Sequence, residues 1–332
     1  MMNTIRIIEN VELFETQNGS IYAGNKANLV VYDKYFNLIE KHDGHISYML
    51  RYKQNILFRI GDVEITYVLN NQNITELSNT TLMGNFIDDN YLYILCSDDL
   101  ICKYSENFNL EDRYNIGRFP KLIFQDKFLR TPNKSMLCYS LDSNVQLWQY
   151  KFTDLLLGVE IHQAGNIVIF EEKVYFYLYD NKGSNRATVC IDTNTGEVLH
   201  TYDNFGGDLY LFGNKIGVAN SKTAQVLNLD TNEITEYDFC NILQEDDLKI
   251  SWNHNIFTED GLLYFVGGKS IFTTNHLGVI DLNKQELIWH SLIEIHDEDN
   301  INNNIQDIKL VDNRLYVHCS DNTLHVFENT NG

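Results

Sequence analysis

Short runs of alternating apolar and polar residues recur along the whole chain, and polar turns separate each run from the next. Such runs favour β-strands, because aromatic and β-branched side chains suit a pleated, half-buried surface. In eight places a run opens on a similar pair, usually apolar and then aromatic. The pairs are Ile21-Tyr22, Leu57-Phe58, Leu92-Tyr93, Phe128-Leu129, Val174-Tyr175, Ile216-Gly217, Leu263-Tyr264 and Leu315-Tyr316.

The spacing of these pairs predicts the architecture. They follow one another at steps of about 35 to about 50 residues, the repeat length of a four-stranded propeller blade. One such sheet cannot bury both of its faces alone, so it needs neighbours stacked against it. We therefore expect an all-β fold, a single closed β-propeller domain over residues 1–332 with eight four-stranded blades. Seven blades remain the alternative if the region around Phe128 is divided too finely.

The last repeat is one strand short. Its expected strands are Ile305–Leu310, Arg314–His318 and Thr323–Phe327, and no fourth strand follows. The segment Thr4–Ile8 precedes the first expected strand, Val11–Glu15, and has no other place in the pattern. We expect this N-terminal strand to complete the last blade, because an unpaired sheet edge is a liability.

The turns between third and fourth strands carry a family resemblance. The segment Asp192-Thr193-Asn194-Thr195-Gly196-Glu197-Val198-Leu199-His200 resembles the repeat of PQQ-like (quinoprotein-type, WD40-like) β-propellers, in which an Asp ends the third strand and a Trp follows eight residues later. His200 stands at the Trp position. The pair Asp281 and Trp289 keeps the spacing, Asp230-Thr231-Asn232 keeps the first half, and Asp142 with Trp148 is a shortened variant.

This resemblance implies a fold rather than a chemistry. Asp and Thr side chains cap a tight turn, and the aromatic residue is expected to pack between blades. The quinoprotein enzymes are exported and hold a quinone and calcium. This chain shows no export signal in residues 1–10. We therefore expect no cofactor.

Cysteine usage points to a reducing compartment. The chain has six cysteines, Cys96, Cys102, Cys138, Cys190, Cys240 and Cys319, and most of them lie inside apolar runs. No Cys-x-x-Cys spacing of a metal site is present. Buried thiols of this kind behave as small hydrophobes, so we expect reduced cysteines and a cytoplasmic protein.

The charge balance narrows the class of partner. The chain has 46 acidic and 25 basic residues, a formal net charge of −21. Nucleic acids and anionic membranes need a basic surface, so we expect neither as a partner and instead expect a basic protein. Acidic runs occur in predicted connections that leave one face of the propeller, including the long segment Asn241–Trp252. The predicted partner-binding residues are Asp98, Asp99, Glu245, Asp246, Asp247, Asp297, Glu298 and Asp299.

No motif for catalysis stands out: His-Glu-x-x-His, Gly-x-Ser-x-Gly and a phosphate-binding glycine loop are all missing from the sequence. We expect a non-catalytic, protein-binding propeller with an acidic loop face, in its concrete form an immunity or antitoxin-type protein that neutralises a basic toxin. The alternative is a metal-dependent hydrolase or lyase whose carboxylates and histidines converge at the hub from several blades.

Overall fold

The computed structural model describes residues 2–61, 66–70, 73–77, 85–87, 91–95, 100–116, 120–158, 160–270, 274–295 and 304–329. The chain divides into two compact units. The N-terminal unit is Asn10–Gln149, and the C-terminal unit is Tyr150–Gly332 together with Met1–Glu9. Across the described ranges the only helix is α1 (Phe152–Leu155), and none is long and apolar enough to cross a membrane.

The N-terminal unit contains four sheets, each built from four consecutive antiparallel strands. Blade 1 holds β2 (Leu13–Gln17), β3 (Ser20–Gly24), β4 (Asn28–Tyr32) and β5 (Leu38–Asp43), and blade 2 holds β6 (Ile46–Tyr52), β7 (Asn55–Ile60), β8 (Thr66–Asn70) and β9 (Asn73–Leu77). Blade 3 holds β10 (Asn85–Ile87), β11 (Leu92–Leu95), β12 (Leu100–Tyr104) and β13 (Leu110–Asn115). Blade 4 holds β14 (Leu122–Phe124), β15 (Lys127–Arg130), β16 (Ser135–Ser140) and β17 (Gln146–Lys151).

The C-terminal unit continues the pattern. Blade 5 holds β18 (Ile161–Phe170), β19 (Lys173–Asp180), β20 (Arg186–Asp192) and β21 (Val198–Asp203), and blade 6 holds β22 (Tyr210–Phe212), β23 (Lys215–Asn220), β24 (Thr223–Asn228) and β25 (Ile234–Asp238). In blade 7 the first strand is divided, because β26 (Lys249–Ile250) and β27 (Ile256–Phe257) both pair with β28 (Leu262–Gly268). The strands β29 (His276–Asp281) and β30 (Glu286–Leu292) complete that sheet.

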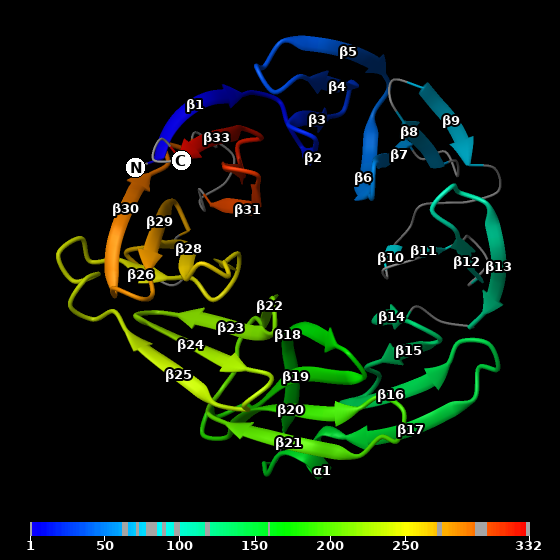
Figure 1. Ribbon diagram of the computed structural model, residues 1–332, viewed down its shortest axis with the longest axis vertical. Helices are drawn as coiled ribbons and strands as arrows, with labels where there is room; N and C mark the ends of the chain where they lie inside the picture. The colour runs from blue at the N-terminus through cyan, green and yellow to red at the C-terminus, as the bar shows by residue number, and fades with distance from the viewer. Residues whose placement is uncertain are drawn as a thin grey trace. The chain divides into compact units, whose positions relative to one another are not determined.

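Blade 8 joins the two ends of the chain. Its strands are β31 (Ile305–Val311), β32 (Arg314–Cys319), β33 (Leu324–Asn329) and β1 (Met2–Ile8), in the order β31-β32-β33-β1. β1 runs antiparallel to β33, from the pair Met2↔Asn329 to the pair Ile8↔Leu324, and Figure 1 shows the two strands side by side. The prediction that the N-terminal strand supplies the missing fourth strand is confirmed.

The protein is therefore all-β, with eight four-stranded blades arranged as a β-propeller. Each of the eight repeated pairs lies on the second strand of its own sheet. Phe128-Leu129 lies on β15, and β14–β17 form a separate four-stranded sheet. The seven-blade alternative is wrong.

Within each unit, neighbouring blades pack through apolar clusters. Between blades 5 and 6, Tyr175, Phe205 and Ile216 are fully buried in one cluster. Between blades 7 and 8, the ring of Trp289 meets that of Phe327 edge-on, with centroids 5.5 Å apart. The aromatic residue at the repeat's Trp position thus packs between blades in this pair, as expected. His200, at the same position in blade 5, is exposed instead.

A side chain at the end of the third strand caps the following turn. Asp192 Oδ1 accepts hydrogen bonds from the backbone N–H groups of Asn194 (2.9 Å) and Thr195 (2.7 Å) and from the Thr195 hydroxyl (3.0 Å). The buried core of a blade does not by itself determine the conformation of such a turn. The hydrogen bonds to the Asp192 carboxylate do.

The sequence comparison misplaced two of these caps. In blade 6 the capping side chain is Asn228, whose Oδ1 accepts from the N–H groups of residues 230 and 231, and in blade 4 it is Ser140, whose hydroxyl accepts from residue 143. The predicted positions Asp230 and Asp142 each lie two residues too late, because the repeat pattern has Asp at this position, whereas Asn and Ser can make the same bond.

The described cysteines form no disulfide with one another. Cys102, Cys138, Cys190 and Cys319 are buried, and Cys240 is exposed. Cys96 lies outside the described residues. Burial raises the pKa of the Cys138 and Cys319 thiols to about 12.

Candidate functional site

Three of the eight predicted partner-binding residues can be placed. Glu245, Asp246 and Asp247 are consecutive and exposed in the connection between blades 6 and 7. The other five, Asp98, Asp99, Asp297, Glu298 and Asp299, lie outside the described residues. The predicted connection Asn241–Trp252 proves shorter, because β26 begins at Lys249. We call Glu245–Asp247 the acidic loop.

Buried side chains on both flanks fix the base of the acidic loop. Phe239, Leu243 and Leu248 are fully buried in the cluster between blades 6 and 7. The Leu243 N–H donates to the Phe239 carbonyl, and the Leu248 N–H donates to the Leu243 carbonyl, each at 3.0 Å. Asp247 itself takes a left-handed conformation, with φ at 51°. The three carboxylates therefore project from a packed support rather than from a long free loop.

Backbone pairing brings this connection to the same end of blade 6 as the turn between β23 and β24. Ser221 and Ile250 exchange two N–H to carbonyl hydrogen bonds of 2.8 and 2.7 Å. Phe239 N–H also donates to the Lys222 carbonyl at 2.8 Å. On the blade 7 side, Asp246 Oδ2 lies 3.3 Å from His290 Nε2. The carboxylate of Asp246 is thus positioned by a side chain of β30.

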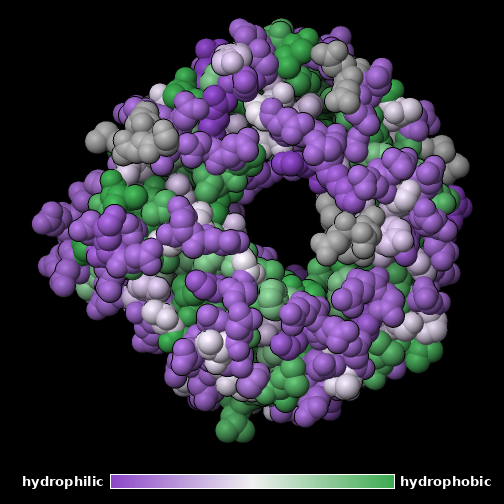
Figure 2. Space-filling view, in the orientation of Figure 1, coloured by the Kyte–Doolittle hydropathy of each residue, from purple (hydrophilic) through white to green (hydrophobic). Residues whose placement is uncertain are grey.

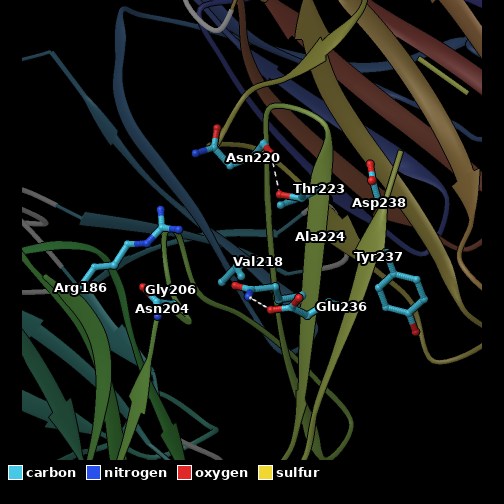
Figure 3. A pocket seen from close by; sticks show the side chains of 12 residues that line it. Arg186, Asn204, Gly206, Val218, Asn220, Thr223, Ala224, Glu236, Tyr237 and Asp238 are labelled. Carbon is cyan, nitrogen blue, oxygen red and sulfur yellow. Dashed lines mark hydrogen bonds between the residues drawn. The ribbon is translucent and has the colours of Figure 1, made fainter. Parts of the chain in front are cut away.

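A cavity of about 410 Å³ opens beside this end, between blades 5 and 6. Arg186 and Asn204 line it from blade 5, and Gln225, Glu236 and Asp238 line it from blade 6. Figure 3 shows Arg186 on one side of the cavity and Glu236 with Asp238 on the other. We call it the inter-blade cavity.

The carboxylates of the inter-blade cavity are held by hydrogen bonds. Gln225 Nε2 donates to Glu236 Oε1 at 2.8 Å, a bond drawn in Figure 3. Asp238 Oδ1 accepts from the Cys240 N–H at 2.8 Å. Hydrogen bonds from Cys240 lower the pKa of the Asp238 carboxyl. Each of the two carboxylates is thus oriented by one hydrogen bond.

A glycine shapes the blade 5 side of the cavity. Gly206 has φ at 147°, and a Cβ placed there would overlap the ring of Tyr177. Any other residue would therefore have to displace a buried aromatic ring. The backbone can approach the cavity here only because the position is glycine.

A second cavity, of about 430 Å³, shares Arg186 and Asn204 with the first and adds Leu155, Leu156 and Leu157 from the end of α1. Leu157 is 83% exposed, and its carbonyl accepts from Asn185 Nδ2 at 2.9 Å. Figure 2 shows a hydrophobic projection where Figure 1 places the end of α1, on a face that is otherwise largely hydrophilic. An apolar contact point thus adjoins the polar cavities.

One further carboxylate stands out in the C-terminal unit. Asp208 Oδ1 accepts the N–H of Asn166, from blade 5, at 2.9 Å. Burial raises the pKa of the Asp208 carboxyl, and His254 in blade 7 counteracts the shift. The hydrogen bond between Asp208 and Asn166 ties blade 6 to blade 5.

Throughout the described ranges no cluster of three or more His, Cys, Asp or Glu side chains has the arrangement of a metal site.

Sequence reasoning missed Arg186, Gln225 and Glu236. Arg186 is the first residue of β20 and follows the connection of residues 181–185 from β19. Gln225 and Glu236 are directly opposite each other in the β24–β25 ladder. Predicting their hydrogen bond would have required the register of that hairpin.

No protein-family model matches the chain, and no curated protein matches it. Solved structures share the fold. BamB from Moraxella catarrhalis has 11% sequence identity and a TM-score of 0.57, with 100% of this chain and 99% of that chain covered. The computationally designed protein Ika8 has 12% identity and a TM-score of 0.63, with 97% and 96% covered. At these identities the comparison supports the propeller fold and nothing finer.

Proposed function

We propose that this protein is a non-catalytic propeller that binds a basic protein through the loop end of blades 5 to 7. The observation that carries the proposal is the acidic loop, Glu245–Asp247, which is exposed and supported by the fully buried Leu243 and Leu248. Binding surfaces usually consist of loops on a rigid scaffold. Three consecutive carboxylates in a chain of net charge −21 favour a partner of the opposite sign.

In the concrete form of the proposal, the partner is a basic toxin such as a nuclease, and the protein acts as its immunity or antitoxin-type inhibitor. The carboxylates of the acidic loop would occupy positions that substrate phosphates take in the toxin. Long-range attraction between the charges accelerates association and is screened by salt, over roughly 8 Å at physiological ionic strength.

The test compares two variants with the same change in net charge. The loop variant carries Glu245→Gln, Asp246→Asn and Asp247→Asn. The control carries Glu172→Gln, Glu233→Gln and Glu286→Gln, three exposed acids in turns or strand starts at the opposite ends of blades 5 to 7. Each protein is immobilised, exposed to source lysate at low salt and eluted with a salt gradient.

We expect wild type and control to retain the same basic protein and the loop variant to release it at lower salt. For the toxin form, wild type should block the nuclease activity of the captured protein at a one-to-one ratio, and the loop variant should block it at least tenfold less well. Equal retention by the loop variant and the control would refute the assigned surface. A captured protein with no activity to block would refute the inhibitor form alone.

A further inference from the structure

The inter-blade cavity carries opposite charges on facing walls. Its blade 5 wall presents Arg186, at the start of β20, and its blade 6 wall presents Glu236 and Asp238, from β25. Figure 3 shows the guanidinium and the two carboxylates on opposite sides. A volume of about 410 Å³ falls within the range of roughly 300–1,000 Å³ typical of small-molecule sites.

The acidic wall is organised before any ligand arrives. Glu236 Oε1 already accepts from Gln225 Nε2 at 2.8 Å, and no described residue hydrogen-bonds its second oxygen, Oε2. Asp238 Oδ1 is held by the Cys240 N–H. A cation entering the cavity would therefore meet two carboxylates that one hydrogen bond each already orients, and such orientation before binding favours affinity.

The basic wall offers a free guanidinium. No described residue forms a hydrogen bond or ion pair with the side chain of Arg186, which lines the cavity. The chain nevertheless has 46 acidic residues that could pair with its 25 basic ones. A guanidinium is always charged and presents a planar set of donors that matches a carboxylate in bidentate geometry. Arg186 is thus available for an anionic group of a ligand.

We propose that the inter-blade cavity binds a basic amino-acid unit with a free carboxylate, that is, arginine or lysine. The side-chain cation would contact Glu236 and Asp238, and the α-carboxylate would contact Arg186. The two walls belong to different blades, so the opposite charges of the ligand need a spacer between them, which the arginine or lysine side chain supplies. The unit is either the free amino acid or the C-terminal residue of a polypeptide. This inference goes beyond the proposed function and does not depend on the acidic loop.

Isothermal titration calorimetry with defined probes tests the chemistry. L-arginine is compared with L-citrulline, which lacks the side-chain cation, and with L-argininamide, which lacks the carboxylate. We expect each analogue to bind at least tenfold more weakly than L-arginine. A short peptide ending in arginine, with its C-terminal amide as control, identifies the source. Tighter binding of the peptide than of L-arginine indicates a polypeptide terminus, and the reverse order indicates the free amino acid.

Variants assign the two walls. Arg186→Gln should weaken L-arginine binding at least tenfold and remove the preference over L-argininamide. Glu236→Gln should weaken L-arginine binding at least tenfold and remove the preference over L-citrulline. The matched control is Glu233→Gln, an exposed position just before the same strand, which should bind like wild type. Circular dichroism and the thermal midpoint show whether each variant is folded.

Two results would overturn the inference: no measurable binding of L-arginine, L-lysine or the peptide, or equal binding of L-arginine by wild type and both wall variants. The loop variant separates this inference from the proposed function. The loop variant should lose partner retention and keep its L-arginine affinity within about twofold. The proposed function and the inference about the cavity can therefore fail independently of each other.

Discussion

The pairing of β1 with β33 makes a sharp prediction about two adjacent isoleucines. Ile8 is 6% exposed and lies opposite Leu324, whereas Ile7 is 49% exposed and lies opposite His325. Side chains alternate between the faces of a strand, so a shift of one residue would exchange the two environments. Ile8→Ala should lower the free energy of unfolding by about 2–5 kcal/mol, the usual cost of truncating a buried isoleucine. Ile7→Ala removes half-exposed surface and should cost about 1 kcal/mol.

Urea denaturation followed by tryptophan fluorescence measures both effects. Trp289 is a local reporter, because its ring contacts Phe327 and Phe327 lies opposite Thr4 of β1. A variant that loosens β1 should therefore change the fluorescence of Trp289 early in the transition. Equal midpoints for Ile7→Ala and Ile8→Ala, or the reverse order, would refute both the register and the assignment of β1 to blade 8.

Three further predictions concern the turn caps, the histidines and the thiols. Asp192→Ala should lower the free energy of unfolding by about 1–2 kcal/mol, since it removes the cap of a turn, whereas Asp142→Ala should change it by less than about 0.5 kcal/mol; urea midpoints check both, and equal losses would contradict the reassigned caps. Burial lowers the pKa of His325, so the unfolded state takes up a proton first as the pH falls. The contribution of neutral His325 to the free energy of unfolding is therefore fully present above the ordinary histidine pKa of about 6.5 and should decline below it. His325→Gln should flatten this dependence between pH 7 and 5, and an unchanged slope would contradict the assignment. Finally, among the described cysteines only Cys240 is exposed, so a thiol reagent should label Cys240 in the native protein and leave Cys138 unmodified until it unfolds. Mass spectrometry of the labelled peptides decides this, with fast labelling of Cys138 as the contrary outcome.

The fold was predictable because its determinants are local and repeated. Each blade carries its own apolar second strand, such as Leu57-Phe58 on β7 and Val174-Tyr175 on β19, so the period is visible without any knowledge of distant contacts. The missing strand of blade 8 was predictable for the same reason, since a repeat one strand short leaves only the segment at the other end of the chain. Cap identity was less predictable, because Asn228 and Ser140 make the bond that Asp192 makes in blade 5.

The site was predictable only where it is continuous in sequence. The acidic loop is a run of three neighbours and can be seen directly. The inter-blade cavity depends on Arg186 and Glu236, which are 50 positions apart in the numbering and belong to different blades. Whether these two residues line the same cavity depends on the register of two hairpins and on the stacking of blades 5 and 6. Neither hydrophobic periodicity nor charge counts contain that information.

The acidic loop and the inter-blade cavity lie at the same end of blade 6 but differ in the physics of binding. The loop carboxylates are exposed, so their attraction for a partner extends through solvent, is weakened by salt and selects by sign of charge. The cavity carboxylates, Glu236 and Asp238, are exposed as well. Each is oriented by one hydrogen bond, and Arg186 lines the opposite wall, so the cavity selects a ligand by the positions of its donors and acceptors. Salt should therefore reduce capture through the loop more steeply than binding of L-arginine in the cavity. If a partner engages both, the loop would govern the rate of association and the cavity the rate of dissociation, because steering acts before contact and fixed hydrogen bonds act after it.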